Sequence, residues 1–371
     1  MRWPSTELTE RLGIRYPIVQ APMAGATSPE LVAAVSNAGG LGSLGAALLP
    51  PDDLRRTIGE IRRLTDQPFN VNLFAWRDPA QPDPAVVAAV VAALAPYRAR
   101  IGVPDDAVLP LPPSLEVLLH AQLAVVCEEA VPVFSFTFGI PPLDKVQATG
   151  ALIMGTATTV DEAVALERAG VDVVVAQGAE AGGHRGGFLA PFEASLIGTL
   201  ALVPQVVDRV RLPVVAAGGI MDGRGIAAAL ALGAHGAQLG TAFLACPESA
   251  AHPLHRAALS RSSDTGTCVT AVYSGRPARA FRTALIRDLE AHLPGPLEFP
   301  LQYARTGPIH YAAAEVGDED LMFLLAGQAA GLARSLPAAE LVETLARETE
   351  TVITSLCPPS GEAAPHSPAR P

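Results

Sequence analysis

Eight short apolar segments, each followed by a helical stretch, restrict the fold of this chain more than any other feature. They cover residues 18–21, 41–44, 69–73, 133–136, 151–154, 171–176, 213–217 and 236–239. The segment at 171–176 is β-branched and almost continuously apolar, which is typical of a parallel strand that is buried on both faces. Eight β/α units in chain order predict an α/β protein with a (β/α)8 TIM barrel, and a doubly wound parallel sheet is the alternative.

The composition along the chain suggests a barrel, an appendage and a tail. The barrel is expected to occupy residues 1–245 together with parts of 300–330. Residues 246–356 contain helical stretches broken by prolines, so we expect a mainly helical C-terminal appendage over one mouth of the barrel. Residues 357–371 are rich in Pro, Ser and Ala and lack core-forming side chains, which predicts a disordered tail.

The charge and the composition exclude several classes of partner. Hydrophobic residues make up 49% of the chain and charged residues 17%, which fits an α/β enzyme whose central strands do not meet water. The formal net charge is −11 and the basic residues are scattered. Nucleic acids and anionic membranes attract clustered Lys and Arg, so neither is expected as a partner. The oligomeric state is not indicated by any pattern in the sequence.

The cysteines and the apolar runs indicate the cellular compartment of the protein. The four cysteines lie far apart, without the spacing of a zinc site, so we expect reduced thiols and no metal; they are Cys127, Cys246, Cys268 and Cys357. Residues 1–17 lack the apolar core of a signal peptide, and the longest apolar run, at 85–95, is too short to span a bilayer. We therefore expect a cytoplasmic protein.

A glycine-rich segment at residues 177–187 follows the sixth predicted strand and carries one histidine, His184. Barrels and open α/β sheets bind their ligands at the carboxyl ends of the strands, and glycines let backbone N–H groups approach a bound group. The ordinary pKa of histidine lies near neutral pH, so His184 is the candidate catalytic base. The structural alternative is a histidine that hydrogen-bonds only to backbone carbonyls. Arg185 is either a partner for an anion or a solvent-facing structural residue.

The last two predicted strands end in glycine-bearing loops that fit a phosphate. Gly218 and Gly219 follow the seventh strand, and Gly240 and Thr241 follow the eighth. In barrels these two loops and a short helix often hold an anion by free backbone N–H groups, without a lysine. Either loop alone would indicate only a tight turn, but the two together on adjacent strands favour a phosphate ligand.

Polar and aromatic side chains near the strand ends are further candidates. Asn72 closes the third strand, two residues after Asn70, and suits the imide edge of a flavin or the capping of a turn. Gln177 ends an apolar strand and needs a partner, either a cofactor group or a neighbouring loop carbonyl. Four aromatic residues could wall a substrate site, although apolar packing explains them equally well: Phe74, Trp76, Phe138 and Tyr303.

With these residues in place the chain resembles the nitronate monooxygenase family, formerly called 2-nitropropane dioxygenases. The resemblance extends from residue 17 to about residue 328. Its most specific motifs occur in the family's order, at residues 20–25, 69–72, 177–186, 217–220 and 238–241. Several motifs in one order are far more specific than a single Gly-Gly-His would be.

The resemblance implies FMN, bound noncovalently at the carboxyl ends of the strands. Ala21, Pro22 and Met23 would line the isoalloxazine, and Asn72 and Gln177 would hydrogen-bond the cofactor. His184 matches the family's catalytic histidine, beside the reactive edge of the flavin. The remaining positions implied to surround the cofactor are Gly182, Gly183, Gly218, Gly219, Gln238, Gly240 and Thr241.

The implied reaction is the oxidation of an alkyl nitronate by O2 to a carbonyl compound and nitrite. A neutral nitroalkane would first lose its carbon-bound proton to His184. Two reductases of the same structural group remain as alternatives: a flavin-dependent enoyl-acyl-carrier-protein reductase and an NAD(P)H:quinone reductase. Gln177, Arg185 and the segment at residues 274–279 favour the monooxygenase. A noncatalytic flavin-binding barrel is the alternative from a different class.

Overall fold

Eight parallel strands form one sheet that curves until its first and last members meet. The computed structural model describes residues 5–75 and 77–356, so Trp76 and the predicted tail lie outside the described residues. The sheet has the order β1-β9-β8-β6-β5-β4-β3-β2, and a parallel bridge between Val19 and Leu41 joins its two edges. The predicted TIM barrel is therefore confirmed, and the doubly wound alternative is wrong. The strands are β1 (Ile18–Gln20), β2 (Gly42–Gly45), β3 (Phe69–Phe74), β4 (Val133–Thr137), β5 (Leu152–Ala157), β6 (Val173–Gln177), β8 (Val214–Ala217) and β9 (Gly236–Leu239).

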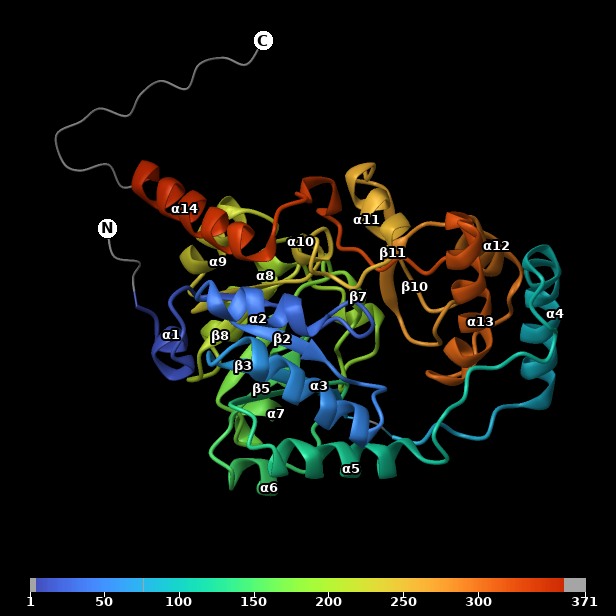
Figure 1. The fold of residues 1–371 in the computed structure, drawn as a ribbon, viewed down its shortest axis with the longest axis horizontal. Coiled ribbons are helices and arrows are strands. Elements are labelled where there is room, and N and C mark those ends of the chain that lie inside the picture. The colour runs from blue at the N-terminus through green and yellow to red at the C-terminus, as the bar shows by residue number, and fades with distance from the viewer. Residues whose placement is uncertain (1–4, 76, 357–371) are drawn as a thin grey trace, which may run out of the picture.

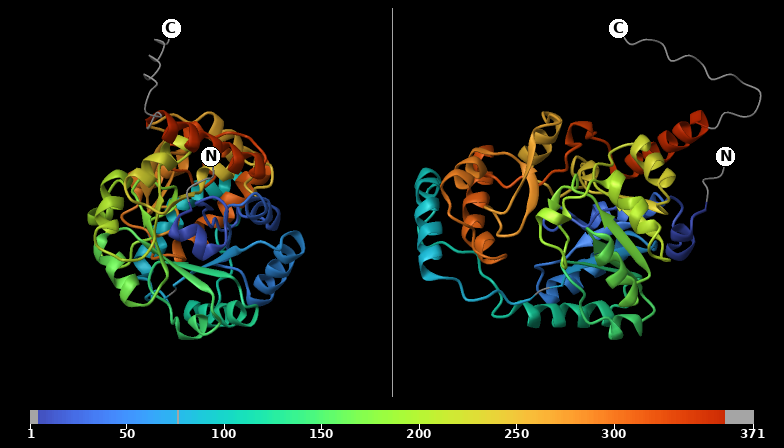
Figure 2. Two further views of the ribbon diagram at one scale, coloured as in Figure 1. Left: turned by 90° about the vertical axis from the view of Figure 1, so that its left-hand side faces the viewer. Right: turned by 180° about the vertical axis from the view of Figure 1, so that it is seen from behind.

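Helices surround this barrel, and a further helix closes its amino end. The surrounding helices are α2 (Pro29–Asn37), α3 (Pro51–Leu64), α5 (Leu115–Glu128), α6 (Asp144–Gln147), α7 (Val160–Arg168), α8 (Thr199–Val207), α9 (Gly223–Ala231) and α14 (Ala338–Leu356). Helix α1 (Glu7–Leu12) places Leu8 and Leu12 among the side chains that fill the barrel interior. In Figure 2, left, this blue helix lies across the centre of the ring. The opposite, carboxyl end of the strands is left for the site.

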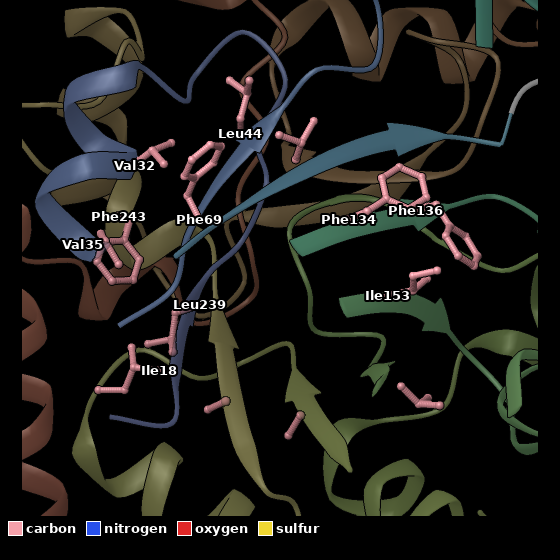
Figure 3. Packing of buried hydrophobic residues seen from close by; sticks show 14 of the residues in the cluster. Ile18, Val32, Val35, Leu44, Phe69, Phe134, Phe136, Ile153, Leu239 and Phe243 are labelled. Atoms are coloured by element: carbon pink, nitrogen blue, oxygen red, sulfur yellow. The ribbon is translucent and has the colours of Figure 1, made fainter. Parts of the chain in front are cut away.

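Side chains along each strand point alternately outward, to the surrounding helices, and inward, to the barrel interior. Val71 and Leu73 on β3 belong to the large cluster between the strands and the outer helices, part of which Figure 3 shows around Phe69, Phe134 and Phe136. Asn70 and Asn72 alternate with them, so they point to the other side of the strand. Both amides donate to Ser135 Oγ on β4, each at 2.8 Å. The polar layer that the sequence placed at the end of the third strand thus lies inside the barrel.

The seam between β1 and β2 depends on one buried side chain. The backbone ladder there is short, with Gln20 N–H donating to Leu41 O at 2.9 Å. The Gln20 side chain extends it, because Oε1 accepts the backbone N–H of Ser43 at 2.8 Å and Nε2 donates to the carbonyl of Ala21. Gln20 is completely buried. Its amide therefore completes the closure of the barrel, in place of backbone hydrogen bonds.

The appendage has a core of its own and contains a small antiparallel sheet. Its strands are β10 (Thr267–Thr270), β11 (Ala278–Phe281) and β7 (Gly183–His184), and its short helices are α10 (Thr241–Leu244), α11 (Pro253–Ser260) and α12 (Ala284–His292), with α13 (Leu301–Val316) beside them. Single 3-10 turns lie at Glu193–Ser195, Glu319–Leu321 and Ala330–Leu332. The prediction of a mainly helical appendage missed this sheet, and above all missed that β7 comes from the glycine-rich loop.

Two helices belong to the other unit than the one predicted for them from the sequence. Helix α4 (Pro84–Ile101) follows β3, within the range predicted for the barrel, but its Val90 and Leu94 pack in the core of the appendage. Helix α14, within the range predicted for the appendage, packs Leu341 and Leu345 into the barrel core beside α9 and α2. Figure 1 shows α4 next to α13, far from the α14 end of the molecule. The appendage is thus an insertion between the last strand and the last helix of the barrel.

Helix α4 is by length and composition apolar enough to cross a membrane, with a mean hydropathy of 1.3. A single helix of this kind is weak evidence for a membrane location, and in the structure α4 packs against α12 and α13. Cys127, Cys246 and Cys268 are free thiols, and Cys357 lies outside the described residues.

We expect Gln20→Leu to lower the free energy of unfolding by about 1–3 kcal/mol, because it leaves the Ser43 N–H buried without an acceptor. Denaturant unfolding monitored by circular dichroism measures this. The matched control is Gln205→Leu, since Gln205 is an exposed residue of α8 that bonds only to Ala201 O within its own helix. Equal stability of the two variants would contradict the role of Gln20 in the seam.

Candidate active site

His184 belongs to the sheet of the appendage as well as to the barrel. It follows β6 by seven residues and forms β7, which pairs antiparallel with β11 so that His184 lies opposite Ala278 and Gly183 opposite Arg279. The next residue, Arg185, donates its N–H to Pro277 O at 2.8 Å. The sequence predicted a pliable glycine loop here. The structure instead holds the histidine in the register of a sheet whose other strands lie about a hundred residues further along the chain.

Among the described residues, three phenylalanines and one serine lie around the imidazole. The His184 ring centroid lies 4.9 Å from Phe299, 5.9 Å from Phe138 and 6.5 Å from Phe74. Nε2 lies 3.0 Å from Ser274 Oγ. Burial and the positive charge of Arg276 together lower the pKa of His184 from 6.5 to about 3. At neutral pH the ring is therefore uncharged and able to accept a proton.

Ser274 determines which nitrogen of His184 is the acceptor. Its hydroxyl donates to Arg276 O at 3.0 Å, so its hydrogen is not available for the imidazole. The Nε2–H tautomer of His184 fits this arrangement, because it can donate to Ser274 Oγ. Nδ1 has no hydrogen-bond partner within residues 5–75 and 77–356, and it keeps the lone pair. Nδ1 is thus the ring nitrogen whose lone pair is available for a proton.

The side chains of Gln177 and Arg185 hold the loop. Gln177 donates to His184 O at 3.1 Å and accepts the Gly186 N–H at 2.8 Å, so a loop carbonyl is the partner that its amide finds. Arg185 is only 3% exposed, and it donates to the carbonyls of Gln177, Gly178 and Ser195. Arg185 is therefore a structural residue that holds the loop, but it is buried, so the expectation that it faces solvent was wrong.

Glu162 anchors the far end of the same loop, and the sequence treated it only as part of a helix start. Its buried carboxylate accepts the backbone N–H groups of Phe188 and Leu189, and also the N–H and hydroxyl of Thr158. Burial raises the pKa of Glu162, but the hydrogen bonds from Leu189, Phe188 and Thr158 outweigh it and leave the pKa below its ordinary value. Glu162 is at the third position of α7, where an acidic residue is common, so its sequence position carried no signal of this role.

Of the positions expected to line a flavin ring, three follow β1 beside Gly240, and Asn72 and Gln238 lie within β3 and β9. Ala21, Pro22 and Met23 are half-buried after β1. A methyl group added at Gly240 would lie 3.4 Å from Ala21 Cβ and 3.7 Å from Met23 Sδ, so this glycine directly adjoins the β1 loop. Asn72 is held by Ser135 through Nδ2, and its Oδ1 has no partner among the described residues. Gln238 is half-buried on β9, where it pairs with Val19.

The glycine loops after β8 and β9 present free backbone donors. Gly218 and Gly219 have φ angles of +111° and +72°, which only glycine adopts without strain. In the described part of the chain, the N–H groups of Gly219, Gly240 and Thr241 have no acceptor. Such donors at adjoining loops and at a helix start fit a phosphate. The residues present therefore fit a ligand with an anionic end near β8 and β9 and a flat ring near Met23.

The protein itself fills the space at Gly182 and at the N-terminus of α8. A methyl group at Gly182 would lie 2.5 Å from Gly327 N, so the appendage requires this glycine by its close approach. Gly183 has a φ of +77° and open space around it. Glu180 places its carboxylate at the start of α8 and accepts the Thr199 N–H at 2.9 Å. The N-terminus of α8 is therefore not available to a phosphate, which leaves the loops after β8 and β9.

The aromatic residues predicted to wall the substrate site lie in two different places. Phe74 and Phe138 flank His184, and Phe138 does so with a φ of +78°, a strained conformation for a bulky residue. Tyr303 lies in the appendage instead, where its hydroxyl is 3.1 Å from that of Tyr311. Phe299, whose ring is the nearest to His184 among the described aromatic residues, comes from the appendage and was not predicted.

Comparisons with known proteins agree over nearly the whole chain. The family model described as nitronate monooxygenase matches residues 5–348. A probable nitronate monooxygenase from Staphylococcus saprophyticus is 42% identical over 354 residues, covering 94% of this chain and 99% of that protein. Crystal structures of a nitroalkane oxidase from Streptomyces ansochromogenes share 42% identity at a TM-score of 0.86, over 94% of this chain and 99% of that one. The structure of FabK from Thermotoga maritima shares 33% identity at a TM-score of 0.75, over 96% and 99% of the two chains.

Glu162→Gln should lower the free energy of unfolding at pH 7 by about 1.5–3 kcal/mol, because it removes charged acceptors from buried N–H groups. The folded-state pKa of Glu162 lies below the unfolded value of 4.5, so the contribution of the carboxylate is present above pH 4.5 and is lost as the pH falls through the folded pKa. Unfolding curves between pH 7 and pH 3 should therefore converge for the variant and the unsubstituted protein. Glu116→Gln, at an exposed position of α5, is the control and should change stability little at any pH; a constant gap for Glu162→Gln would refute the interpretation.

Proposed function

This chain belongs to the nitronate monooxygenase family, and on that premise we propose that it binds FMN and oxidises alkyl nitronates with O2 to a carbonyl compound and nitrite. The enzyme is an oxidoreductase of the flavin-dependent type. The observation that carries the proposal is a neutral histidine, held in a sheet register beside the carboxyl ends of β3, β4 and β6. It combines a proton acceptor with a site for an anionic, ring-bearing cofactor.

The chain's own groups account for the binding of FMN. The phosphate would accept the free N–H groups of Gly219, Gly240 and Thr241, and the isoalloxazine would lie against Ala21 and Met23. Asn72 Oδ1 supplies an acceptor for a ring N–H. When bound, FMN supplies the redox chemistry, taking electrons from the substrate and passing them to O2. Binding by backbone donors explains why no lysine is needed at the phosphate.

The state of His184 favours nitronates over nitroalkanes. A preformed nitronate has already lost its carbon-bound proton, so it needs only orientation and charge stabilisation from the protein. A neutral nitroalkane must give that proton to Nδ1 of His184. An imidazole with a pKa of about 3 is a weak base, and its protonation becomes favourable only as negative charge develops on the substrate beside it. Phe74, Phe138 and Phe299 keep water from the ring and would hold the alkyl part of the substrate.

A second candidate is a reductase that takes electrons from NAD(P)H. The similarity to FabK from Thermotoga maritima supports it, with 33% identity over nearly the whole of both chains. The similarity to the Streptomyces nitroalkane oxidase is greater in both sequence and structure. The electron donor therefore decides between the two functions.

We expect anaerobic addition of propyl-2-nitronate to bleach the flavin absorbance of the purified holoenzyme, while NADH and NADPH leave it unchanged. Stopped-flow absorbance measures both reactions on one preparation. Bleaching by NAD(P)H alone would overturn the monooxygenase proposal in favour of the reductase. An unchanged spectrum with every donor would favour a noncatalytic flavin-binding protein.

His184→Asn should lower kcat/KM for neutral 2-nitropropane by about 100-fold or more, the usual contribution of a general base. Turnover of preformed propyl-2-nitronate should fall far less, because no carbon-bound proton has to be removed. The flavin content, measured by absorbance, should not change. The control is His292→Asn, since His292 is an exposed residue of α12 that bonds only to Asp288 O. Equal losses on the two substrates would mean that His184 is not a proton acceptor.

A further inference from the structure

Arg276 is a cation in the site that the proposed mechanism does not yet use. It lies in the segment just before β11, two residues after Ser274. Its Nε donates to Arg185 O at 3.3 Å and its Nη2 donates to Gly187 O. Its Cζ lies 3.8 Å from the centroid of Phe138, so one face of the guanidinium covers that ring. These contacts fix the plane of the guanidinium and leave its Nη1 edge uncommitted.

The structure describes no direct counter-ion for the charge of Arg276 within residues 5–75 and 77–356. Its acceptors are neutral carbonyls, and in the described residues no carboxylate lies within 4 Å of its nitrogens. Burial lowers the pKa of Arg276 to about 10, which still leaves it charged at neutral pH. Burying a charged group without a partner costs desolvation free energy. The half-buried guanidinium therefore favours the binding of an anion that can reach it.

Two neighbouring arginines differ from Arg276 in the contacts of their Nη groups, although Nε of Arg185 also has no partner. Both Nη atoms of Arg185 donate to carbonyl or amide oxygens of the loop. Arg279 uses Nε and Nη2 on Ala179 O and Nη1 on Thr267 Oγ1. Of these three, only Arg276 keeps an Nη group without a partner in the part of the chain that the structure describes.

Arg276 and His184 share two neighbours, Phe138 and Ser274. Phe138 contacts both, with the guanidinium over its face and the imidazole edge-on at 5.9 Å. Ser274 also links them, because its Oγ contacts His184 Nε2 and donates to the backbone carbonyl of Arg276. The lowered pKa of His184 has the charge of Arg276 as one of its causes, so the two groups interact electrostatically.

We propose that Arg276 binds the two oxygens of the substrate's nitronate group and thereby selects planar anions over neutral molecules of the same shape. A guanidinium presents parallel N–H groups that match a planar two-oxygen anion, as in its pairs with carboxylates. The bound anion compensates the unpaired charge and at the same time favours a proton on His184. This inference rests on the proposed function, since it names the part of the nitronate that this residue recognises.

The test compares a carboxylate and an amide that have the size of propyl-2-nitronate. Calorimetric titration of the holoenzyme gives Kd for isobutyrate and for isobutyramide, and steady-state kinetics give KM for propyl-2-nitronate. In Arg276→Met we expect Kd for isobutyrate and KM for the nitronate to rise by about tenfold to a hundredfold, the worth of a charge-assisted hydrogen bond. Kd for isobutyramide should change less than about threefold, because its neutral amide does not need the cation.

Two further variants keep the test decisive. Arg276→Lys keeps the charge but loses the planar fork, so its losses should have the same anion selectivity and be smaller. Should the Met variant not fold, as judged by its thermal midpoint, the Lys variant provides the same comparison. Arg282→Met removes an exposed arginine paired with Glu290 and should match the unsubstituted enzyme.

Equal weakening of isobutyrate and isobutyramide, or unchanged binding of isobutyrate, would overturn the assignment of Arg276. The absence of nitronate oxidation would overturn the proposed function instead. Isobutyrate binding would still report on Arg276 in that case, so the two failures are distinguishable.

Discussion

The pairing of β7 with β11 is the interaction on which the active site depends. Only Gly183 and His184 form this strand, yet they connect the end of a barrel strand to the sheet of the appendage. Through it, Ser274 reaches Nε2 of the histidine and Phe299 packs against its ring. Without this pairing the histidine would be a mobile side chain in a glycine loop. With it, the tautomer, the orientation and the burial of the ring are all set by the appendage.

The loop that carries His184 is held by buried polar side chains. Gln177 binds it at its start, Arg185 beneath it, and Glu162 where it leaves the site. Each of these groups satisfies backbone atoms that an irregular buried segment would otherwise leave without partners. Arg276 also binds carbonyls of this loop, and its Nη1 has no hydrogen-bond partner among the described residues. A rigid loop with one uncommitted cation is suited to an anionic substrate.

The insertion of the appendage explains how a TIM barrel acquires this site. The chain leaves the barrel after β9, builds a second core with the help of α4, and returns to supply the last outer helix, α14. Both ends of the insertion are therefore fixed to the barrel. The appendage also reaches the loop after β9, since Gly327 N–H donates to Thr241 Oγ1 at 2.9 Å. A movement of the appendage would therefore displace His184 and the loop after β9 together.

The sequence by itself determined the barrel, the positions of its strands and the loops at their carboxyl ends. Those features are encoded locally, in runs of apolar residues and in glycines at strand exits, so residues such as Gly219, Gly240 and Asn72 could be placed without coordinates. Only the tertiary structure determined which backbone groups Gln177, Arg185 and Glu162 bind. It also brought Ser274, Arg276 and Phe299 to His184. These partners lie far apart along the chain, with 90 residues between Ser274 and His184. No local pattern specifies such contacts, because they exist only once two separate cores have packed against each other.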